Sequence, residues 1–218
     1  MSATGSHSEL SSRDRSILTA LSRSVRVLSL DQVAKTWWSA GLEASATQRA
    51  KARARLRQLE LDGHLWLSER VATIEHLPPA PLAAWQRGLP RPDLESVSQL
   101  ACKRFSAPVR AVTCVVASKQ SGVWLSGKGG DESAASELSH DLLLGEVFLY
   151  MMRALPTRAR LWRGEAVLPH QQGAKIPDAV VRDGAHRTAV ELVGQYSAKK
   201  LNSFHDYCAK NRLAYELW

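Results

Sequence analysis

The stretch TQRAKARARLRQ, residues 47–58, is the most informative part of the chain, because it carries charge of a single sign. Its cations occupy alternate positions, and no acidic residue lies among them. The cations are Arg49, Lys51, Arg53, Arg55 and Arg57. Gly63 follows, and glycine commonly lies just beyond the end of a helix. We therefore expect a basic helix that begins at Thr47 and ends near Asp62.

The alanines and leucines of this stretch predict which side of the helix faces solvent. Ala52, Leu56 and Leu59 lie at helical spacing and form an apolar stripe. Ala50 and Ala54 lie on the opposite face, where small side chains let another molecule approach the backbone closely. Solvated helix faces usually mix charges of both signs, so five cations of one sign favour contact with a polyanion.

Two shorter helices are expected before the basic one. Residues 13–22 have apolar side chains at helical spacing behind Ser12, which can cap that helix. Ser29 and Gln32 have the form of a capping box, in which each side chain bonds the backbone of the other residue. The sequence therefore predicts a second helix that begins just after Ser29.

A small ribbon is expected after the basic helix. Apolar runs at residues 64–67 and 71–74 predict two short strands, joined by a tip at residues 68–70. Three helices followed by such a ribbon are typical of a winged helix-turn-helix module. A basic third helix in that module usually enters the major groove of DNA, and Arg70 at the tip would then touch the backbone or the minor groove.

Composition narrows the partners and the compartment. The formal net charge is +8 and the pI about 9.7, which biases binding toward polyanions. The three cysteines form no metal-binding or redox pair, which favours a reducing, cytoplasmic compartment. Residues 1–10 lack the features of a signal peptide, and the apolar stretch at residues 142–152 is too short for a membrane span. We therefore expect a soluble protein with no membrane partner.

Prolines and composition shifts divide the chain. Five prolines between residues 77 and 93 predict a connector without regular structure. The expected parts are a flexible tail (1–11), a winged helix DNA-binding domain (12–77), a Pro-rich connector (78–92) and a nuclease-like α/β domain (93–218). The expected fold class is thus α+β.

The second half predicts a mixed succession of helices and strands. Asp178–Arg182 and Arg187–Val193 read as a hairpin, because Asp183-Gly184 is a common two-residue turn. The other expected elements are helices at 93–105, 134–155 and 197–211, strands at 109–117, 123–125, 160–162, 166–168 and 213–218, and a flexible glycine-rich loop at 126–133.

Two carboxylates in this hairpin could share a divalent cation. Asp178 opens one strand and Glu191 lies on the other, and Glu146 on the preceding helix could complete the oxygen ligands of Mg²⁺. This layout resembles the PD-(D/E)xK nuclease fold. That motif places a lysine two residues after the second acid, where this chain has Val193. Lys199 or Lys200 in the following helix could supply the missing ammonium group.

The same residues also have structural interpretations. Asp178 could simply begin the hairpin, and a half-buried Glu191 needs a partner, which Lys199, Lys200 or Arg182 could provide without catalysis. His140 and His170 are candidate general bases. Capping or packing is the alternative role for His140.

The succession of short motifs in the second half resembles the replication-relaxation family of bacterial plasmids and mobile elements, which pairs a winged helix with a degenerate nuclease-like domain. The residues that carry the resemblance are Ser139-His140-Asp141-Leu142, Glu146-Val147, Arg160-Leu161-Trp162, Glu165, Ile176-Pro177-Asp178-Ala179, Val190-Glu191, Tyr196, Lys200-Leu201, Phe204 and Tyr207. Family members often have an acid where this chain has Val193. The resemblance implies DNA binding in the replication, its control or the mobilisation of such elements.

We therefore expect a non-catalytic protein that binds double-stranded DNA and needs no cofactor. One alternative is a Mg²⁺-dependent endonuclease that uses Asp178, Glu191 and Lys199 or Lys200, and another is a scaffold for a second DNA-processing protein. A homodimer and a replication or transfer protein are further candidate partners. The expected DNA-binding residues are Arg49, Lys51, Arg53, Arg55, Arg57, Gln58 and Arg70.

Overall fold

The computed structural model describes residues 9–39, 41, 43–169 and 176–218, so most of the expected tail and His170 lie outside the described residues. The expected α+β class is confirmed, since helices accompany two sheets. The chain forms two compact units, and neither is a single continuous segment. Unit 1 contains Met1–Arg70 and Val112–Glu132, and unit 2 contains Val71–Ala111 and Ser133–Trp218.

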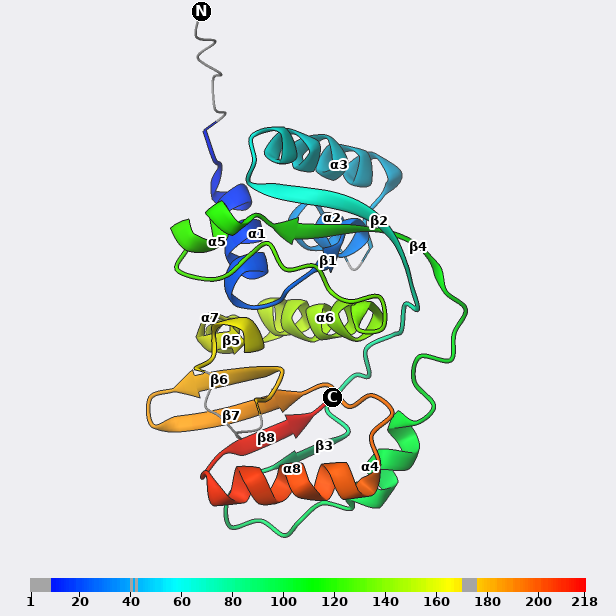
Figure 1. Ribbon diagram of the computed structural model, residues 1–218, viewed down its shortest axis with the longest axis vertical. Helices are drawn as coiled ribbons and strands as arrows, with labels where there is room; N and C mark the ends of the chain where they lie inside the picture. Colours follow the sequence, from blue (N-terminus) through cyan, green and yellow to red (C-terminus); the bar gives the residue numbers. More distant parts are fainter. Residues whose placement is uncertain (1–8, 40, 42, 170–175) are drawn as a thin grey trace, which may run out of the picture. The chain divides into compact units, whose positions relative to one another are not determined.

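Three capped helices build the first part of unit 1 (Figure 1). They are α1 (Ser12–Arg23), α2 (Leu30–Trp37) and α3 (Ala46–Leu61). Each is preceded by a serine that forms a capping box. The serine side chain accepts from the backbone of the residue three positions on, and the side chain of that residue accepts from the serine backbone. The capping box predicted at Ser29 and Gln32 is confirmed, while α3 is capped by Ser45 and not by Thr47.

The buried side of α3 is the predicted one. Ala52, Leu56 and Leu59 are all fully buried, and the helix packs mainly on α2. Gly63 has a positive φ of 76°, which a glycine adopts without the strain that a side chain would cause. The predicted stop just beyond α3 is therefore confirmed.

The sheet of unit 1 corrects the prediction of a local ribbon. Its strand order is β1 (Leu28–Ser29), β4 (Arg110–Ala117) and β2 (Leu65–Ala72). The runs predicted as two strands, 64–67 and 71–74, belong largely to the one strand β2, and the expected tip at 68–70 lies inside it. Its partner is β4: the Ser118 nitrogen donates to the His64 oxygen (3.0 Å), and the Thr113 hydroxyl donates to Glu69 (2.7 Å).

The segment after β4 is helical and then tightly packed. Residues 123–125, predicted as a strand, lie in and just after helix α5 (Lys119–Trp124). The predicted flexible loop that follows is held by backbone hydrogen bonds, such as that from Lys128 to the Ser22 oxygen (2.8 Å). A Cβ added at Gly127 would lie 2.2 Å from the same Ser22 oxygen. The glycines thus allow close backbone packing and do not mark a loose loop.

Unit 2 is built on a five-stranded sheet, whose strand order is β3-β8-β7-β6-β5 (Figure 1). The pairs β5–β6, β6–β7 and β3–β8 are antiparallel, and β7–β8 is parallel. The hairpin predicted at Asp183-Gly184 joins β6 and β7 as expected. The strands are β3 (Ala83–Trp85), β5 (Trp162–Gly164), β6 (Ala179–Asp183), β7 (His186–Glu191) and β8 (Ala214–Leu217).

Three predicted segments of unit 2 are corrected. The Pro-rich connector contains an edge strand, β3, in which Ala84 lies opposite Glu216. Residues 160–162 mostly belong to helix α7 (Pro156–Leu161), and residues 166–168 to the short 3₁₀ helix Glu165–Val167. Residues 112–132 belong to unit 1, whereas the residues on either side of them belong to unit 2.

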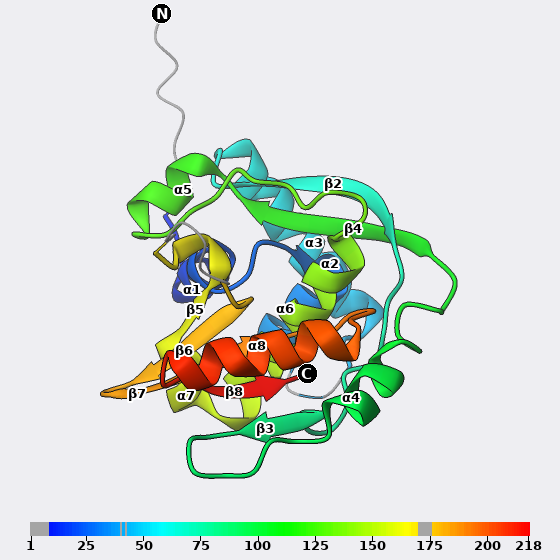
Figure 2. The same cartoon turned by 60° about the horizontal axis from the view of Figure 1, so that its bottom comes forward.

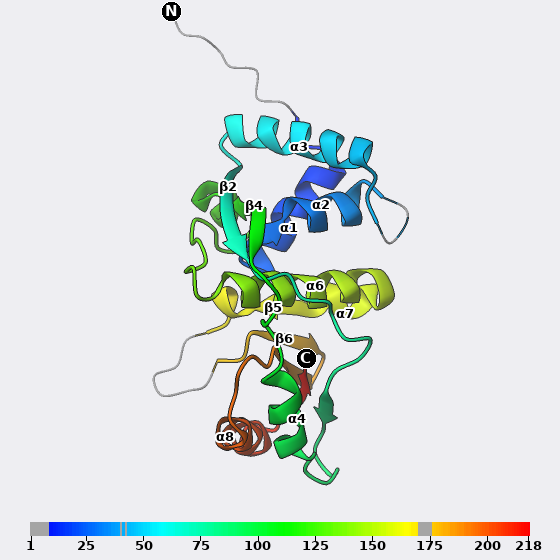
Figure 3. The same cartoon turned by 90° about the vertical axis from the view of Figure 1, so that its right-hand side faces the viewer.

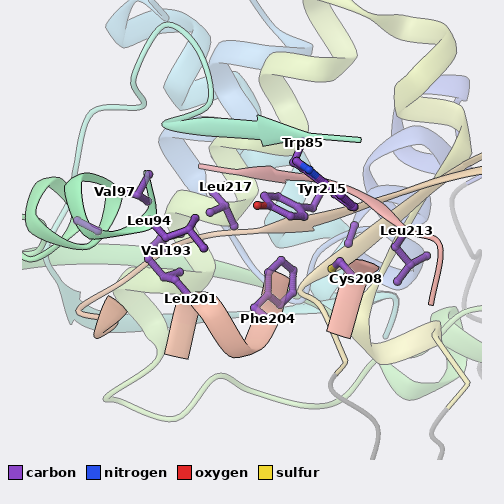
Figure 4. Packing of buried hydrophobic residues seen from close by; sticks show 12 residues of the cluster. Trp85, Leu94, Val97, Val193, Leu201, Phe204, Cys208, Leu213, Tyr215 and Leu217 are labelled. Carbon is purple, nitrogen blue, oxygen red and sulfur yellow. The ribbon is translucent and has the colours of Figure 1, made fainter. Parts of the chain in front are cut away.

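Helices cover both faces of the unit 2 sheet (Figures 2 and 3). On one side lie α4 (Leu94–Ala101) and α8 (Ala198–Lys210), and on the other α6 (Leu138–Ala154) and α7. The α8 side chains Leu201, Phe204 and Cys208 pack against Tyr215 and other core residues (Figure 4). Across the described ranges, no helix combines the length and apolar character needed to cross a membrane.

Candidate functional site

The outer face of α3 carries exposed cations beside exposed alanines. Lys51 and Arg53 are exposed, and within the described ranges neither has a carboxylate partner. Ala50 and Ala54 are also exposed, and so is Arg57. This face therefore combines a surface that another molecule can approach closely with long side chains that can reach toward phosphates.

Two further cations of α3 form ion pairs at the surface. Arg49 Nε lies 2.9 Å from Asp31 Oδ1 of α2, with side chains 44% and 72% exposed. Arg57 Nη1 lies 2.9 Å from Glu60 Oε2, one turn further along α3. Arg57 is 57% exposed but Glu60 only 26%, and the other Glu60 oxygen accepts from the Leu67 nitrogen (2.7 Å). Surface pairs contribute roughly 0–1 kcal/mol to stability, so the exposed Arg49 and Arg57 side chains can exchange their partners at small cost.

Arg55 differs from the other α3 cations because its partner is buried. Its Nη2 lies 2.7 Å and its Nε 3.1 Å from the two oxygens of Asp14 in α1, whose side chain is 1% exposed. Burial alone raises the pKa of the Asp14 carboxyl, but hydrogen bonds from Arg55 and Ser11 outweigh it and hold that pKa below its usual value. Arg55 thus joins α1 to α3, and its guanidinium is directed into the protein.

The two remaining residues predicted to contact DNA also have internal partners. Gln58 Nε2 donates to Asp62 Oδ1 (3.1 Å) within the same helix region. Arg70 Nη1 lies 3.0 Å from Glu132 Oε2 and is about a quarter exposed. Arg70 lies within strand β2, so the ribbon tip at which it was expected is not present.

In unit 2 the structure brings Asp178 and Glu191 together. Asp178 lies just before β6 and Glu191 ends β7, in strands where Ala179 is opposite Val190. The Asp178 nitrogen donates to Glu191 Oε2 (3.4 Å), and the Leu192 nitrogen donates to Asp178 Oδ2 (2.7 Å). The hairpin register alone therefore places the two acids side by side.

His140 of α6 completes this cluster, and its role was missed in the sequence. Its Nε2 lies 3.5 Å from Asp178 Oδ2, and its Nδ1 lies 3.4 Å from Asp141 Oδ1. Burial alone lowers the pKa of His140, but hydrogen bonds with the two aspartates raise it to about 10. This favours an imidazolium at neutral pH, which is a counter-ion for the carboxylates and argues against the predicted general-base role.

Glu191 is the most deeply buried acid of the cluster. Burial, together with the nearby charge of Asp178, raises its pKa to about 8, although a hydrogen bond with Tyr196 opposes the shift. Burial and the charge of Glu191 in turn raise the pKa of the Tyr196 phenol. Burial beside Asp178 thus favours the neutral acid form of Glu191, and burial beside Glu191 favours the neutral form of Tyr196.

This donor set does not suit a divalent cation. His140 already brings a positive charge to Asp178, and Glu146 forms an ion pair with Arg153 (2.9 Å). Across residues 9–39, 41, 43–169 and 176–218, no three acidic, histidine or cysteine side chains are grouped so that they could hold a metal ion. The magnesium site predicted from Glu146, Asp178 and Glu191 is therefore not assembled.

The lysine of the nuclease motif has no counterpart at its usual position in this chain. Val193, at the position where the motif has lysine, is fully buried in the apolar core beneath α8 (Figure 4). Lys200 Nζ lies 3.1 Å from the centre of the Tyr196 ring, and the Tyr196 side chain is hydrogen-bonded with Glu191. Lys199 is exposed.

Comparisons of the chain with protein-family models, with curated proteins and with solved structures find no match.

Proposed function

We propose that the chain binds double-stranded DNA through α3 and does not cleave it. The observation that carries the proposal is the exposed face of α3, on which Lys51 and Arg53 border exposed alanines. These two cations can each contact a phosphate without first leaving a carboxylate, and the contact releases counterions condensed on the DNA. The net charge of +8 acts in the same direction.

The architecture of unit 1 supports the same proposal. Three helices precede a sheet in which β2 pairs with β4, and this arrangement suits a winged helix, although its ribbon is closed by a distant strand. The resemblance to the replication-relaxation family suggests a role in the replication of plasmids or mobile elements, its control or their mobilisation. The imidazolium at Asp178 and the apolar Val193 weigh against the endonuclease alternative.

The proposal is tested by fluorescence anisotropy with a 5′-labelled duplex of about 24 base pairs, titrated at several salt concentrations. Replacing both Lys51 and Arg53 with alanine should weaken binding and lower the slope of log K against log salt by about two, because two phosphate contacts are lost. Arg182→Ala in β6 is the control, since it removes one exposed cation from unit 2.

Two outcomes would contradict the proposal. One is the absence of duplex binding by the unaltered protein at low salt. The other is equal binding by the unaltered protein and the double variant, since α3 would then not be the contact surface.

A further inference from the structure

The α3 face contains its own competitors for phosphate. Asp31 and Glu60 each hold one arginine of α3 at 2.9 Å, and Asp31 is largely exposed. A carboxylate presents two anionic oxygens to a guanidinium much as a phosphate does. A DNA phosphate could therefore replace each carboxylate as the partner of its arginine.

Burial separates these pairs from the third one on the helix. Asp14 is fully buried and accepts hydrogen bonds from two nitrogens of Arg55. It also helps to cap α1 by accepting from the Ser11 nitrogen. The Arg49–Asp31 pair rests on a single nitrogen–oxygen contact between exposed side chains. Exchange of partners is therefore open to Arg49 and Arg57 but not to Arg55.

We infer that Asp31 and Glu60 are built-in inhibitors of DNA binding, which hold Arg49 and Arg57 until a phosphate backbone displaces them. This inference rests on the proposed function. An isolated anion would then find only Lys51 and Arg53 of α3 ready to bind it. A DNA duplex would be contacted by these two residues and also by Arg49 and Arg57. When an arginine leaves its carboxylate, that carboxylate must take up a cation, which offsets the counterions released from DNA.

The test uses amide substitutions that preserve shape. Asp31→Asn and Glu60→Gln remove one negative charge each, and Gln at 60 keeps an oxygen that can accept from the Leu67 nitrogen, as Glu60 now does at 2.7 Å. The control is Glu95→Gln in α4, which changes the net charge equally and alters an exposed acid of unit 2. Thermal melts followed by circular dichroism establish that each variant is folded.

In the same 24-base-pair duplex assay, each α3 variant should bind about three- to tenfold more tightly than the unaltered protein in roughly 50 mM salt. Each should also steepen the salt slope by up to about one, because no carboxylate is left to take up a cation. In the Asp31→Asn background, Arg49→Ala should weaken binding more than it does in the unaltered protein. Glu95→Gln should change neither quantity.

Unchanged affinity and salt slope in both α3 variants would overturn the inference. An equal gain in affinity in Glu95→Gln would also overturn it, because the gain would then come from the change in net charge alone. Failure of the proposed function is distinguishable from this outcome. In that case the unaltered protein would not bind the duplex, or its binding would be unchanged when Lys51 and Arg53 are replaced with alanine. Either result would also remove the basis of the inference.

Discussion

Arg49 and Arg55 lie on the same helix and have the same chemistry, yet they serve different ends because their partners differ in burial. Asp31 is open to solvent, whereas Asp14 is enclosed by α1 and α3. Removing one member of a buried pair leaves a charge without compensation, and this costs roughly 3–5 kcal/mol. An exposed pair has no such consequence.

Arg55→Ala should therefore lower the free energy of unfolding by about 3 kcal/mol, because Asp14 would keep a buried charge without its guanidinium. Urea unfolding followed by circular dichroism measures this. Arg53→Ala, two residues away on the exposed face, is the matched control and should change stability by less than about 0.5 kcal/mol. Similar losses in both variants would contradict the anchoring role of Arg55.

The cluster around His140 predicts how stability depends on pH. The folded-state pKa values of Glu191 (about 8) and His140 (about 10) both lie above their ordinary values of 4.5 and 6.5. A group whose pKa is raised on folding stabilises the protein at low pH, and that stabilisation is lost as pH rises through the folded-state pKa. Stability should therefore fall from about pH 5 to pH 10, by at most roughly 1.4 kcal/mol per pH unit for each group.

Thermal melts between pH 5 and pH 10 measure this dependence. Glu191→Gln should flatten the lower part of the range, from about pH 4.5 to 8, and leave the part due to His140. A melting temperature that rises from pH 6 to pH 9 would contradict the assignment of His140 as a buried cation.

At the scale of elements, three local signals predicted their structures correctly, whereas two distant strand pairings could not be predicted. The capping box at Ser29, the buried stripe of α3 and the Asp183-Gly184 hairpin depend on neighbours within a few residues, so the sequence carries them directly. The partner of β2 is β4, which begins only at Arg110, and no local pattern in residues 64–74 indicates it. Likewise β3 is visible as a strand only beside β8, which supplies its hydrogen bonds.

The glycine-rich segment after α5 gives a prediction at this scale. Gly127→Ala should destabilise unit 1 by roughly 1–3 kcal/mol, because its Cβ would lie 2.2 Å from the Ser22 backbone oxygen, which is not the movable end of a side chain. Gly41→Ala is the control, since the nearest atom to its added Cβ is a serine hydroxyl at 3.8 Å. Equal melting temperatures for the two variants would contradict this packing.

At the scale of the whole molecule, the sequence indicated two folded parts but not how the chain is shared between them. Residues 71–111 and 133–218 form unit 2, and residues 112–132 return to unit 1. The candidate sites show the same limit. Periodicity predicted which α3 residues face outward, but the acids that hold them lie on α1, on α2 and one turn along α3. The register of one hairpin predicted the Asp178–Glu191 contact, whereas His140 comes from a helix that local spacing does not connect to it.

The strand order of unit 1 has a practical consequence for mapping activity by deletion. A fragment ending at residue 77 looks like a complete DNA-binding module in the sequence, yet it lacks β4, the central strand between β1 and β2. Such a fragment would lose its fold, and loss of binding would be misattributed to missing contacts in unit 2. Residues 69 and 113 touch across β2 and β4, so excising 73–109, which lies between these strands, and bridging the gap with a short turn keeps the three strands adjacent.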